Sequence, residues 1–138
     1  MNKYRNYKKS CEEKVNNFPM MFAFSKSQFE EGLTKLGSTK EEVMSIGAGG
    51  FIRKSDMKSF ETLMDDLDLE LSKHIKEDDE FVLQMFEYEM GNHEYCITRD
   101  DEKIAHICGL SINEIIYDER LAELYKRAKK NYLRGVKY

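Results

Sequence analysis

Cysteine is too scarce in this sequence to build a disulfide framework. The 138 residues hold only Cys11, Cys96 and Cys108, an odd and unevenly spaced set unlike that of disulfide-rich secreted domains. No apolar stretch approaches the roughly 20 residues of a membrane-spanning helix. No apolar segment follows the basic N-terminal residues, as it would in a secretory signal. We therefore expect a protein of the reducing cytoplasm that has no membrane partner.

Signatures of known catalytic and metal sites are also missing. His93 with Cys96, and His106 with Cys108, are residue types that bind zinc, but their spacing is not that of a zinc finger or ribbon. A Cys–His nucleophile pair would need a third orienting group and an oxyanion element, and the sequence offers neither. We expect no metal, no cofactor and no enzymatic activity, with the cysteines packed in the core and His93 at a helix end.

The composition allows one hydrophobic core. Hydrophobic residues make up 41% of the chain and charged residues 35%, as in a folded globular protein too short for two independent cores. The single proline, Pro19, separates a helix or arm over residues 1–17 from one domain over residues 18–138. The predicted fold is α+β and mostly helical, with a small antiparallel sheet and a helical hairpin.

Short apolar runs predict the strands. Met20–Phe24 is a continuous apolar run typical of a buried strand, and His93–Thr98 alternates in part, as a strand does. Two further runs, Val43–Ile46 and Phe51–Lys54, flank the glycines of Gly47–Gly50. This pattern predicts a strand, a tight turn and a second strand.

Capping residues and helical periodicity predict the helices. Ser25 or Ser27 precedes a short helix that ends at Gly37. Ser55 or Asp56 precedes a long helix reaching Ile75, and a second helix over Phe81–Met90 is expected to pair with it in an antiparallel hairpin. Three more helices are expected: one capped by Asp100 or Asp101, one with a capping box of Ser111 and Glu114, and a terminal one over Leu121–Tyr132.

Charge is strongly segregated along the chain. Residues 55–94 hold 13 acids and 3 bases, whereas residues 120–138 hold 7 bases and 1 acid. The long helix carries five acids on its outer face, which we predict to bind a partner: Glu61, Asp65, Asp66, Asp68 and Glu70. Such a row can imitate the charges of a nucleic-acid backbone. The simpler and more frequent alternative is a solvated face that keeps a small protein soluble.

The glycine segment offers an alternative site for a nucleotide or another small anion. Glycines let backbone N–H groups approach an anion, and nearby cations can neutralise it. The residues of this alternative are Gly47, Gly49, Gly50, Arg53, Lys54 and His93. The segment matches neither the P-loop nor the dinucleotide fingerprint, so a plain hairpin turn is the simpler interpretation.

Two further charged features have plain interpretations. Glu89 and His93 lie four residues apart and are expected to form a weak surface ion pair. The terminal helix interleaves tyrosines with five bases: Lys126, Arg127, Lys129, Lys130 and Arg134. This face could touch phosphates, or complement the acidic face within the chain or in a second copy, which leaves a homodimer open. The sequence pI of about 5.5 argues against general nucleic-acid binding.

Three segments together resemble an uncharacterised family of small proteins carried by phages and mobile elements of Gram-positive bacteria. They run from Gly47 to Asp56 (GAGGFIRKSD), from Tyr88 to Cys96 (YEMGNHEYC) and from Cys108 to Glu114 (CGLSINE), and the resemblance covers most of the chain from Phe18 onward. It implies a context rather than an activity, since such accessory proteins often inhibit host defence. We therefore expect a protein of the host bacterial cytoplasm that inhibits a nuclease or other defence effector, with an anti-CRISPR role as one candidate.

Overall fold

The computed structural model describes residues 2–135. Over these residues the chain is 74% helical, with eight α-helices and one antiparallel sheet of three strands. This confirms the predicted mostly helical α+β fold. Residues Lys9–Glu70 form one compact unit, and residues 2–8 together with 71–135 form a second. The predicted division into an arm over residues 1–17 and one domain over residues 18–138 stays a prediction.

The unit Lys9–Glu70 is built around the sheet. It contains the second half of α1 (Lys3–Asn16), β1 (Met21–Phe22), α2 (Lys26–Leu36), β2 (Val43–Gly47), β3 (Gly50–Arg53) and the first part of α3 (Met57–Glu77). Short 3-10 turns over Lys40–Glu42 and Lys54–Asp56 lead into β2 and α3. The strand order is β1-β3-β2, so β3 is central and β1 is an edge.

Only part of the predicted buried strand Met20–Phe24 is a buried strand. Met21 pairs with Phe51 of β3 and is 6% exposed, but Phe22 is 56% exposed and Phe24, beyond the strand, is 77% exposed. The continuous apolar run suggested a strand covered on both faces. The run lies instead at a sheet edge, where only one face is covered.

Local signals in this unit act as predicted. The Ser25 hydroxyl accepts a hydrogen bond from the Gln28 N–H, and Gly37 ends α2 in the left-handed conformation with φ +63°. At the tip of the β2–β3 hairpin, Ala48 and Gly49 both have positive φ, +50° and +79°. Two successive left-handed residues are what a tight two-residue hairpin turn requires.

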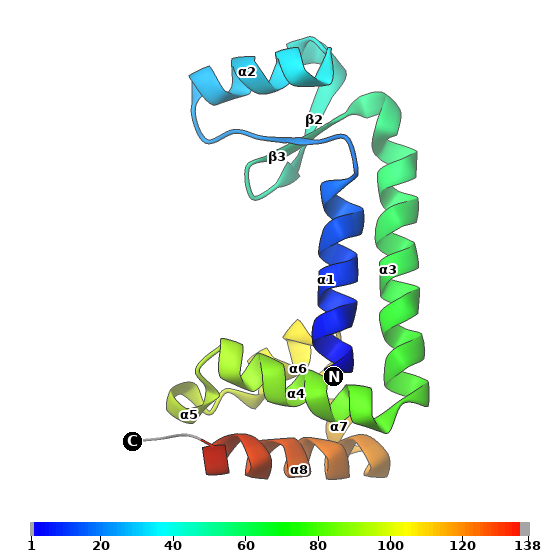
Figure 1. Cartoon of the computed structure of the whole chain (residues 1–138), viewed down its shortest axis with the longest axis vertical. Helices are drawn as coiled ribbons and strands as arrows, with labels where there is room; N and C mark the ends of the chain where they lie inside the picture. The colour runs from blue at the N-terminus through cyan, green and yellow to red at the C-terminus, as the bar shows by residue number, and fades with distance from the viewer. Residues whose placement is uncertain (1, 136–138) are drawn as a thin grey trace. The chain divides into compact units, whose positions relative to one another are not determined.

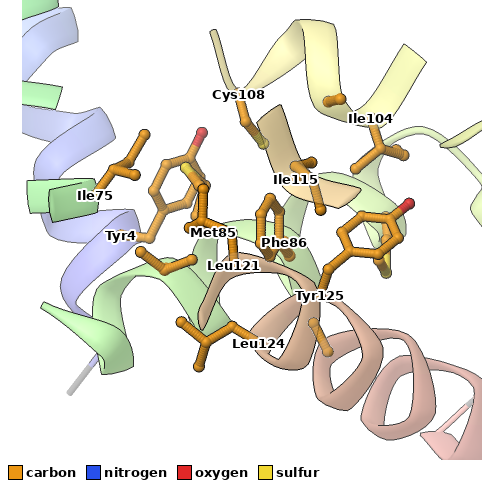
Figure 2. Close-up of a cluster of buried hydrophobic side chains, with 14 of the residues drawn as sticks. Tyr4, Ile75, Met85, Phe86, Ile104, Cys108, Ile115, Leu121, Leu124 and Tyr125 are labelled. Carbon is orange, nitrogen blue, oxygen red and sulfur yellow. The ribbon is translucent and has the colours of Figure 1, made fainter. Parts of the chain in front are cut away.

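The second unit holds the main hydrophobic core (Figure 2). It comprises the first turns of α1, the end of α3, and α4 (Asp79–Asn92), α5 (Tyr95–Thr98), α6 (Asp101–Ile107), α7 (Ile112–Ile116) and α8 (Glu119–Gly135). Met85 and Phe86 of α4 lie at its centre and are fully buried. Leu124 and Tyr125 of α8 pack onto them from one side, and α6 and α7 contribute Ile104 and Ile115.

The predicted antiparallel pairing of α4 with α3 is not what the structure has. Helix α4 lies instead along α8, and the two run in the same direction (Figure 1). The Phe86 ring packs against Tyr125, and the Asn131 amide donates a hydrogen bond to the Glu87 carboxylate. Only Asp78 separates α3 from α4. One residue is too short a connection for two helices to fold back side by side.

The predicted strand His93–Thr98 is not a strand: His93 and Glu94 form a turn, and Tyr95–Thr98 is helical. Glu94 has a left-handed backbone, φ +53°, and the turn α5 follows and ends at Arg99, φ +50°. The aromatic and β-branched residues that suggested a strand do not alternate between two faces of a sheet. Tyr95 is 2% exposed and directs its ring into the core, while Ile97 is 76% exposed. Tertiary packing has overridden the local preference.

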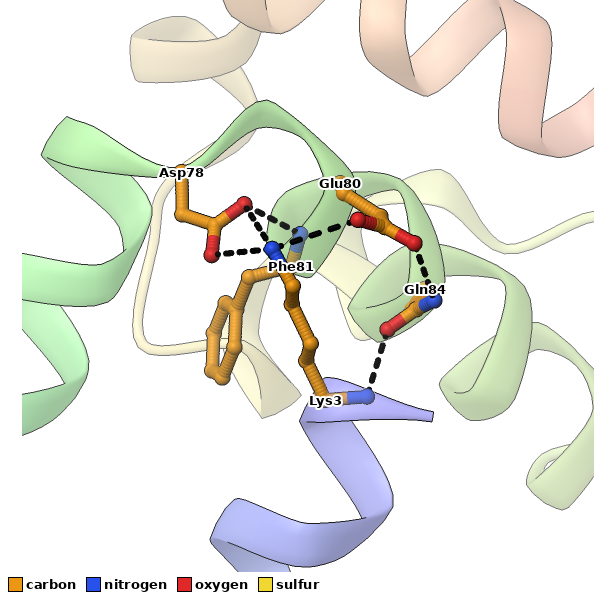
Figure 3. A network of polar contacts seen from close by, with 5 residues as sticks. All are labelled: Lys3, Asp78, Glu80, Phe81 and Gln84. Carbon is orange, nitrogen blue, oxygen red and sulfur yellow. Dashed lines mark hydrogen bonds and ion pairs between the residues drawn. The ribbon is translucent and has the colours of Figure 1, made fainter. Parts of the chain in front are cut away.

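A network of ion pairs and hydrogen bonds connects the start of α1 to the start of α4 (Figure 3). The Lys3 ammonium lies 3.0 Å from an Asp78 carboxylate oxygen and 3.2 Å from Glu80, and its backbone N–H donates to Gln84 at 2.7 Å. The hydrogen bond with Asp78 raises the pKa of Lys3. Asp78 also accepts a hydrogen bond from the Phe81 N–H as the N-cap of α4. One carboxylate therefore caps α4 and forms an ion pair with Lys3 of α1.

No helix among residues 2–135 is both long enough and apolar enough to cross a membrane.

Candidate functional site

The acidic residues of α3 form an exposed, highly charged surface of the unit Lys9–Glu70. Glu61, Asp65, Asp66 and Asp68 are all exposed, and none forms an ion pair or hydrogen bond within residues 2–135. Glu61, Asp65 and Asp68 recur after four and three residues, so they follow one side of the helix at intervals of about 5–6 Å. These carboxylates, which we name the acidic face, are free to meet a partner's cations.

Glu70, the fifth predicted acid, forms an ion pair within the protein. Its carboxylate lies 3.4 Å from the Lys14 ammonium of α1, and its side chain is 35% exposed. Exposed pairs of this kind stabilise a protein by less than about 1 kcal/mol. Glu70 therefore belongs to the contact between α1 and α3 rather than to the acidic face.

An exposed leucine lies within the acidic face. Leu69 is 69% exposed and lies on the side of α3 opposite its apolar stripe, whose members are covered or half covered. Asp65 and Asp66 precede it by four and three residues and so flank it on the helix surface. A large apolar side chain among charges that lack partners resembles the composition of a binding surface, where an anchor sits inside a polar rim. Leu69 was not among the predicted site residues, although its position opposite the apolar stripe of α3 was a signal of exposure.

The glycine segment serves the hairpin. The Gly49 carbonyl accepts a hydrogen bond from the Ala23 N–H at 2.9 Å, and the Phe24 ring covers Gly49 so closely that any β-carbon there would overlap it. The Gly47 N–H donates to the Ser45 hydroxyl at 3.2 Å, and Gly50 is a buried residue of β3. Close packing and turn geometry thus account for these glycines without a ligand.

The cations and the histidine of the anion-site alternative belong to different units or have partners of their own. The Arg53 Nε–H donates to Asp56 at 2.8 Å, and its guanidinium also reaches the Leu36 carbonyl. Lys54 is exposed. His93 belongs to the other unit, where its N–H donates to the Glu89 carbonyl at the end of α4. An anion site at Gly47–Lys54 stays a prediction.

The predicted surface ion pair of Glu89 and His93 is wrong, because Glu89 is buried. Its side chain is 1% exposed, and one carboxylate oxygen accepts from the Tyr4 hydroxyl at 2.9 Å, with the Lys8 ammonium at 3.5 Å. The other oxygen, Oε1, has no hydrogen-bond partner among the described residues. Glu89 follows Met85 by four residues and Phe86 by three, so the helical spacing already placed it on the apolar face.

Groups near Glu89 titrate outside their ordinary range. Burial, reinforced by the Glu89 charge and its hydrogen bond, raises the pKa of the Tyr4 hydroxyl. Burial, again with the Glu89 charge, raises the pKa of the Cys108 thiol to about 12. A thiol that stays protonated at neutral pH is a poor nucleophile and a poor metal ligand. This agrees with the expected packing role of Cys108, which is 1% exposed.

A second polar cluster joins α5, α6 and α8. The hydroxyls of Tyr95 and Tyr125 both donate to one Asp101 oxygen, at 2.5 and 2.6 Å, and the Lys129 ammonium lies 3.6 Å from it and above both rings. Burial alone would raise the pKa of Asp101. The bonds from Tyr125 and Tyr95 and the charge of Lys129 outweigh it and hold this pKa below its usual value. The cluster is satisfied internally and fixes the packing of three helices.

The basic face of α8 is partly used in the same way. Lys129 serves the Asp101 cluster, whereas Lys126, Arg127, Lys130 and Arg134 are exposed. Tyr125 is buried, and the Tyr132 hydroxyl accepts from the Cys96 N–H at 3.1 Å. Both tyrosines are therefore turned to the interior and are not available to stack on nucleic-acid bases.

Among residues 2–135, no three side chains of His, Cys, Asp or Glu gather where they could hold a metal ion. The three cysteines are free thiols, with Cys11 and Cys96 half-buried.

Comparison with known proteins gives a family without an assigned activity. A family model described as "Family of unknown function (DUF7659)" matches residues 3–131, which is nearly the whole chain. No curated protein and no solved structure matches this chain. The resemblance to proteins of phages and mobile elements stays a prediction. The chain belongs to the family of unknown function DUF7659.

Proposed function

We propose that the protein is a non-enzymatic inhibitor that binds a basic surface of a host defence or nucleic-acid-processing enzyme through the acidic face of α3. The observation that supports this proposal is the set of four exposed carboxylates without partners on the described chain: Glu61, Asp65, Asp66 and Asp68. A carboxylate already paired within the protein would have to break that pair before it could bind. Free carboxylates meet a partner's cations without that cost, and their field speeds the encounter.

Leu69 adds an apolar contact to this charged surface. Surface ion pairs alone contribute little affinity, at most about 1 kcal/mol each. Burying a leucine side chain contributes about 1.5–3 kcal/mol. A partner that fits the proposal therefore has an apolar pocket beside Lys or Arg side chains, as the nucleic-acid channel of an enzyme can have.

The target class follows from the chemistry of the face and from the predicted context. A row of carboxylates on a rigid helix presents negative charges at regular intervals, as a phosphate backbone does, and can occupy a channel that binds nucleic acid. In this proposal the protein acts in the cytoplasm of the host bacterial cell, requires no cofactor and does not bind nucleic acid itself.

Affinity capture from host lysate tests the proposal. Tagged protein is incubated at low and high salt, and bound proteins and small molecules are identified by mass spectrometry. We expect a basic protein partner that is lost at high salt and lost with the variant Glu61→Lys, Asp65→Lys and Asp68→Lys. The matched control reverses three exposed acids of the same unit, Glu12, Glu13 and Glu30, and should retain the partner. A partner retained by the first variant would overturn the proposal.

Leu69 gives a second, uncharged test. Leu69→Ser should leave the fold unchanged, because the side chain is largely exposed, and should weaken binding of the captured partner at least tenfold. Unchanged affinity would remove Leu69 from the binding surface. A bound nucleotide without a protein partner would favour the anion-site alternative at Gly47–Lys54.

A further inference from the structure

A groove of about 440 Å³ lies between β1 and α2 in the unit Lys9–Glu70. Its strand side is formed by Met20, Phe22 and Phe24, and its helix side by Gln28, Glu31 and Lys35. Gly32, also on the helix side, lets α2 approach Met21 closely, since a β-carbon at this position would overlap the Met21 side chain. The groove is thus a product of tight packing between α2 and the edge strand.

The strand side of the groove leaves large apolar groups in water. Phe22 is 56% exposed and Phe24 is 77% exposed, two of the six large hydrophobic residues most exposed in the described chain. Single exposed hydrophobic residues are ordinary, but neighbouring aromatics beside a groove indicate a contact surface.

The edge strand beside these rings carries no charge on its open edge. Within the described residues β1 pairs only with β3, and the segment Phe18–Phe24 contains no charged residue. Proteins usually guard a sheet edge with charges, prolines or covering elements. Here Pro19 limits the length of the strand, but nothing charged prevents another strand from pairing with its open edge.

The charges on the helix side are self-complementary. Glu31 and Lys35 are exposed, lie one turn apart on α2, and have no ion-pair partner within residues 2–135. When a helix with this pattern meets its own copy in antiparallel orientation, each Glu31 faces a Lys35 and each Lys35 faces a Glu31. A two-fold interface requires this reciprocity, because one patch must complement itself.

We propose that β1 and α2 form a two-fold symmetric interface with a second copy of this chain. The two β1 strands pair antiparallel and extend the sheet across the axis, which covers Phe22 and Phe24. Helix α2 packs alongside β1 (Figure 1), so the same axis brings the two α2 helices together with reciprocal Glu31–Lys35 pairs. The acidic face of α3 takes no part, so this interface and the proposed function can fail separately.

Sedimentation velocity of the full chain from about 1 to 500 µM, a range that spans weak and moderate self-association, tests the proposal. We expect a concentration-dependent monomer–dimer equilibrium that Phe22→Ser abolishes. Lys35→Glu places like charges at both symmetric contacts and should raise the dissociation constant about tenfold. The swap Glu31→Lys with Lys35→Glu restores opposite charges and should return the dissociation constant to its original value. Glu30→Lys, an exposed change on α2 outside the groove, is the matched control.

Circular dichroism of each variant establishes that the fold is retained, and the exposed helix positions 31 and 35 keep the test valid if Phe22→Ser does not fold. A monomer at every concentration would overturn the proposal. So would a dimer that neither Phe22→Ser nor Lys35→Glu weakens, because it would use another surface. A monomer that instead binds an extended peptide at Phe22 would replace the second copy with a different partner.

Discussion

Glu89 carries a carboxylate into the core of the second unit, where Tyr4 and Lys8 are its partners. We expect Glu89→Ala to destabilise the protein by about 3 kcal/mol, because it leaves the Tyr4 hydroxyl buried without an acceptor and opens a cavity. Tyr4→Phe, which removes one hydrogen bond and keeps the ring, should cost only about 1 kcal/mol. Urea denaturation followed by circular dichroism measures both.

Glu123→Ala is the control for Glu89, since Glu123 is exposed on α8 and its loss should change stability by less than about 0.5 kcal/mol. A Glu89→Ala variant as stable as this control would contradict the buried carboxylate contact.

Asp101 makes the stability of the protein depend on pH. Its pKa is lowered in the folded state, so its carboxylate stabilises the fold above the unfolded pKa of about 3.9, and this contribution is lost as pH falls through the folded value. We expect Asp101→Asn to cost about 1 kcal/mol at neutral pH, a modest value because the side chain is 39% exposed and water screens the charge.

The difference in unfolding free energy between Asp101→Asn and the original protein should shrink as pH falls below the unfolded pKa of about 3.9, and should disappear once the pH is below the lowered folded pKa of Asp101, where both side chains are neutral. Denaturation curves at neutral pH and in acid measure it. A difference that stays constant over this range would show that the charge of Asp101 does not contribute.

Burial was predicted wrongly for a residue whose partner lies far along the chain. Glu89 looked like a surface acid because carboxylates rarely enter a core. Its burial depends on Tyr4, 85 residues away, and no local pattern reveals that contact. Leu69 presents the opposite case. It lies two residues from both Leu67 and Leu71, on the side of α3 opposite the apolar stripe, so the helical spacing already indicates its exposure.

Among the elements, helix ends could be predicted well because caps are local. Ser25, Gly37 and the Ser111–Glu114 capping box begin or end helices through hydrogen bonds that span at most five residues. The turn at Ala48–Gly49 was predictable for the same reason. The helical turn α5 could not be predicted in this way, because it depends on tertiary contacts: the Tyr95 ring packs in the core and its hydroxyl donates to Asp101.

Element pairing depended on geometry that periodicity does not contain. The apolar stripes of α3 and α4 indicated that each helix packs on something, but not on what. The single residue between them prevents a hairpin, and α8, more than 25 residues beyond α4, becomes the neighbour of α4.

Gly32 tests the packing of α2 on β1. A β-carbon at this position would lie 3.1 Å from both Cβ and Cγ of Met21 and would overlap its sulfur. We expect Gly32→Ala to destabilise the protein by about 1–2 kcal/mol, since overpacking outweighs the gain of about 1 kcal/mol in helix propensity. In a Met21→Ala background the same change should become stabilising by about 1 kcal/mol, because the clash is gone and the propensity remains. Equal effects in both backgrounds would contradict the contact.

Across the whole molecule, opposite charges are separated into exposed sets without partners on the chain. Four carboxylates of α3 and four cations of α8 are exposed and lack partners within the described residues. Several other charges are paired within the protein, as in Lys3 with Asp78 and Glu80, Lys14 with Glu70, and Lys129 with Asp101. The acidic face of α3, whose carboxylates have no partners on the described chain, is therefore a surface suited to a basic partner.

The affinity of the captured partner as a function of salt tests the acidic face most directly. The protein is compared with a variant in which the four acids are neutralised, Glu61→Gln, Asp65→Asn, Asp66→Asn and Asp68→Asn. We predict steep salt dependence for the protein, and for the variant a loss of about a hundredfold at low salt with a much shallower dependence. Equal affinities and equal salt dependence would contradict binding through the acidic face.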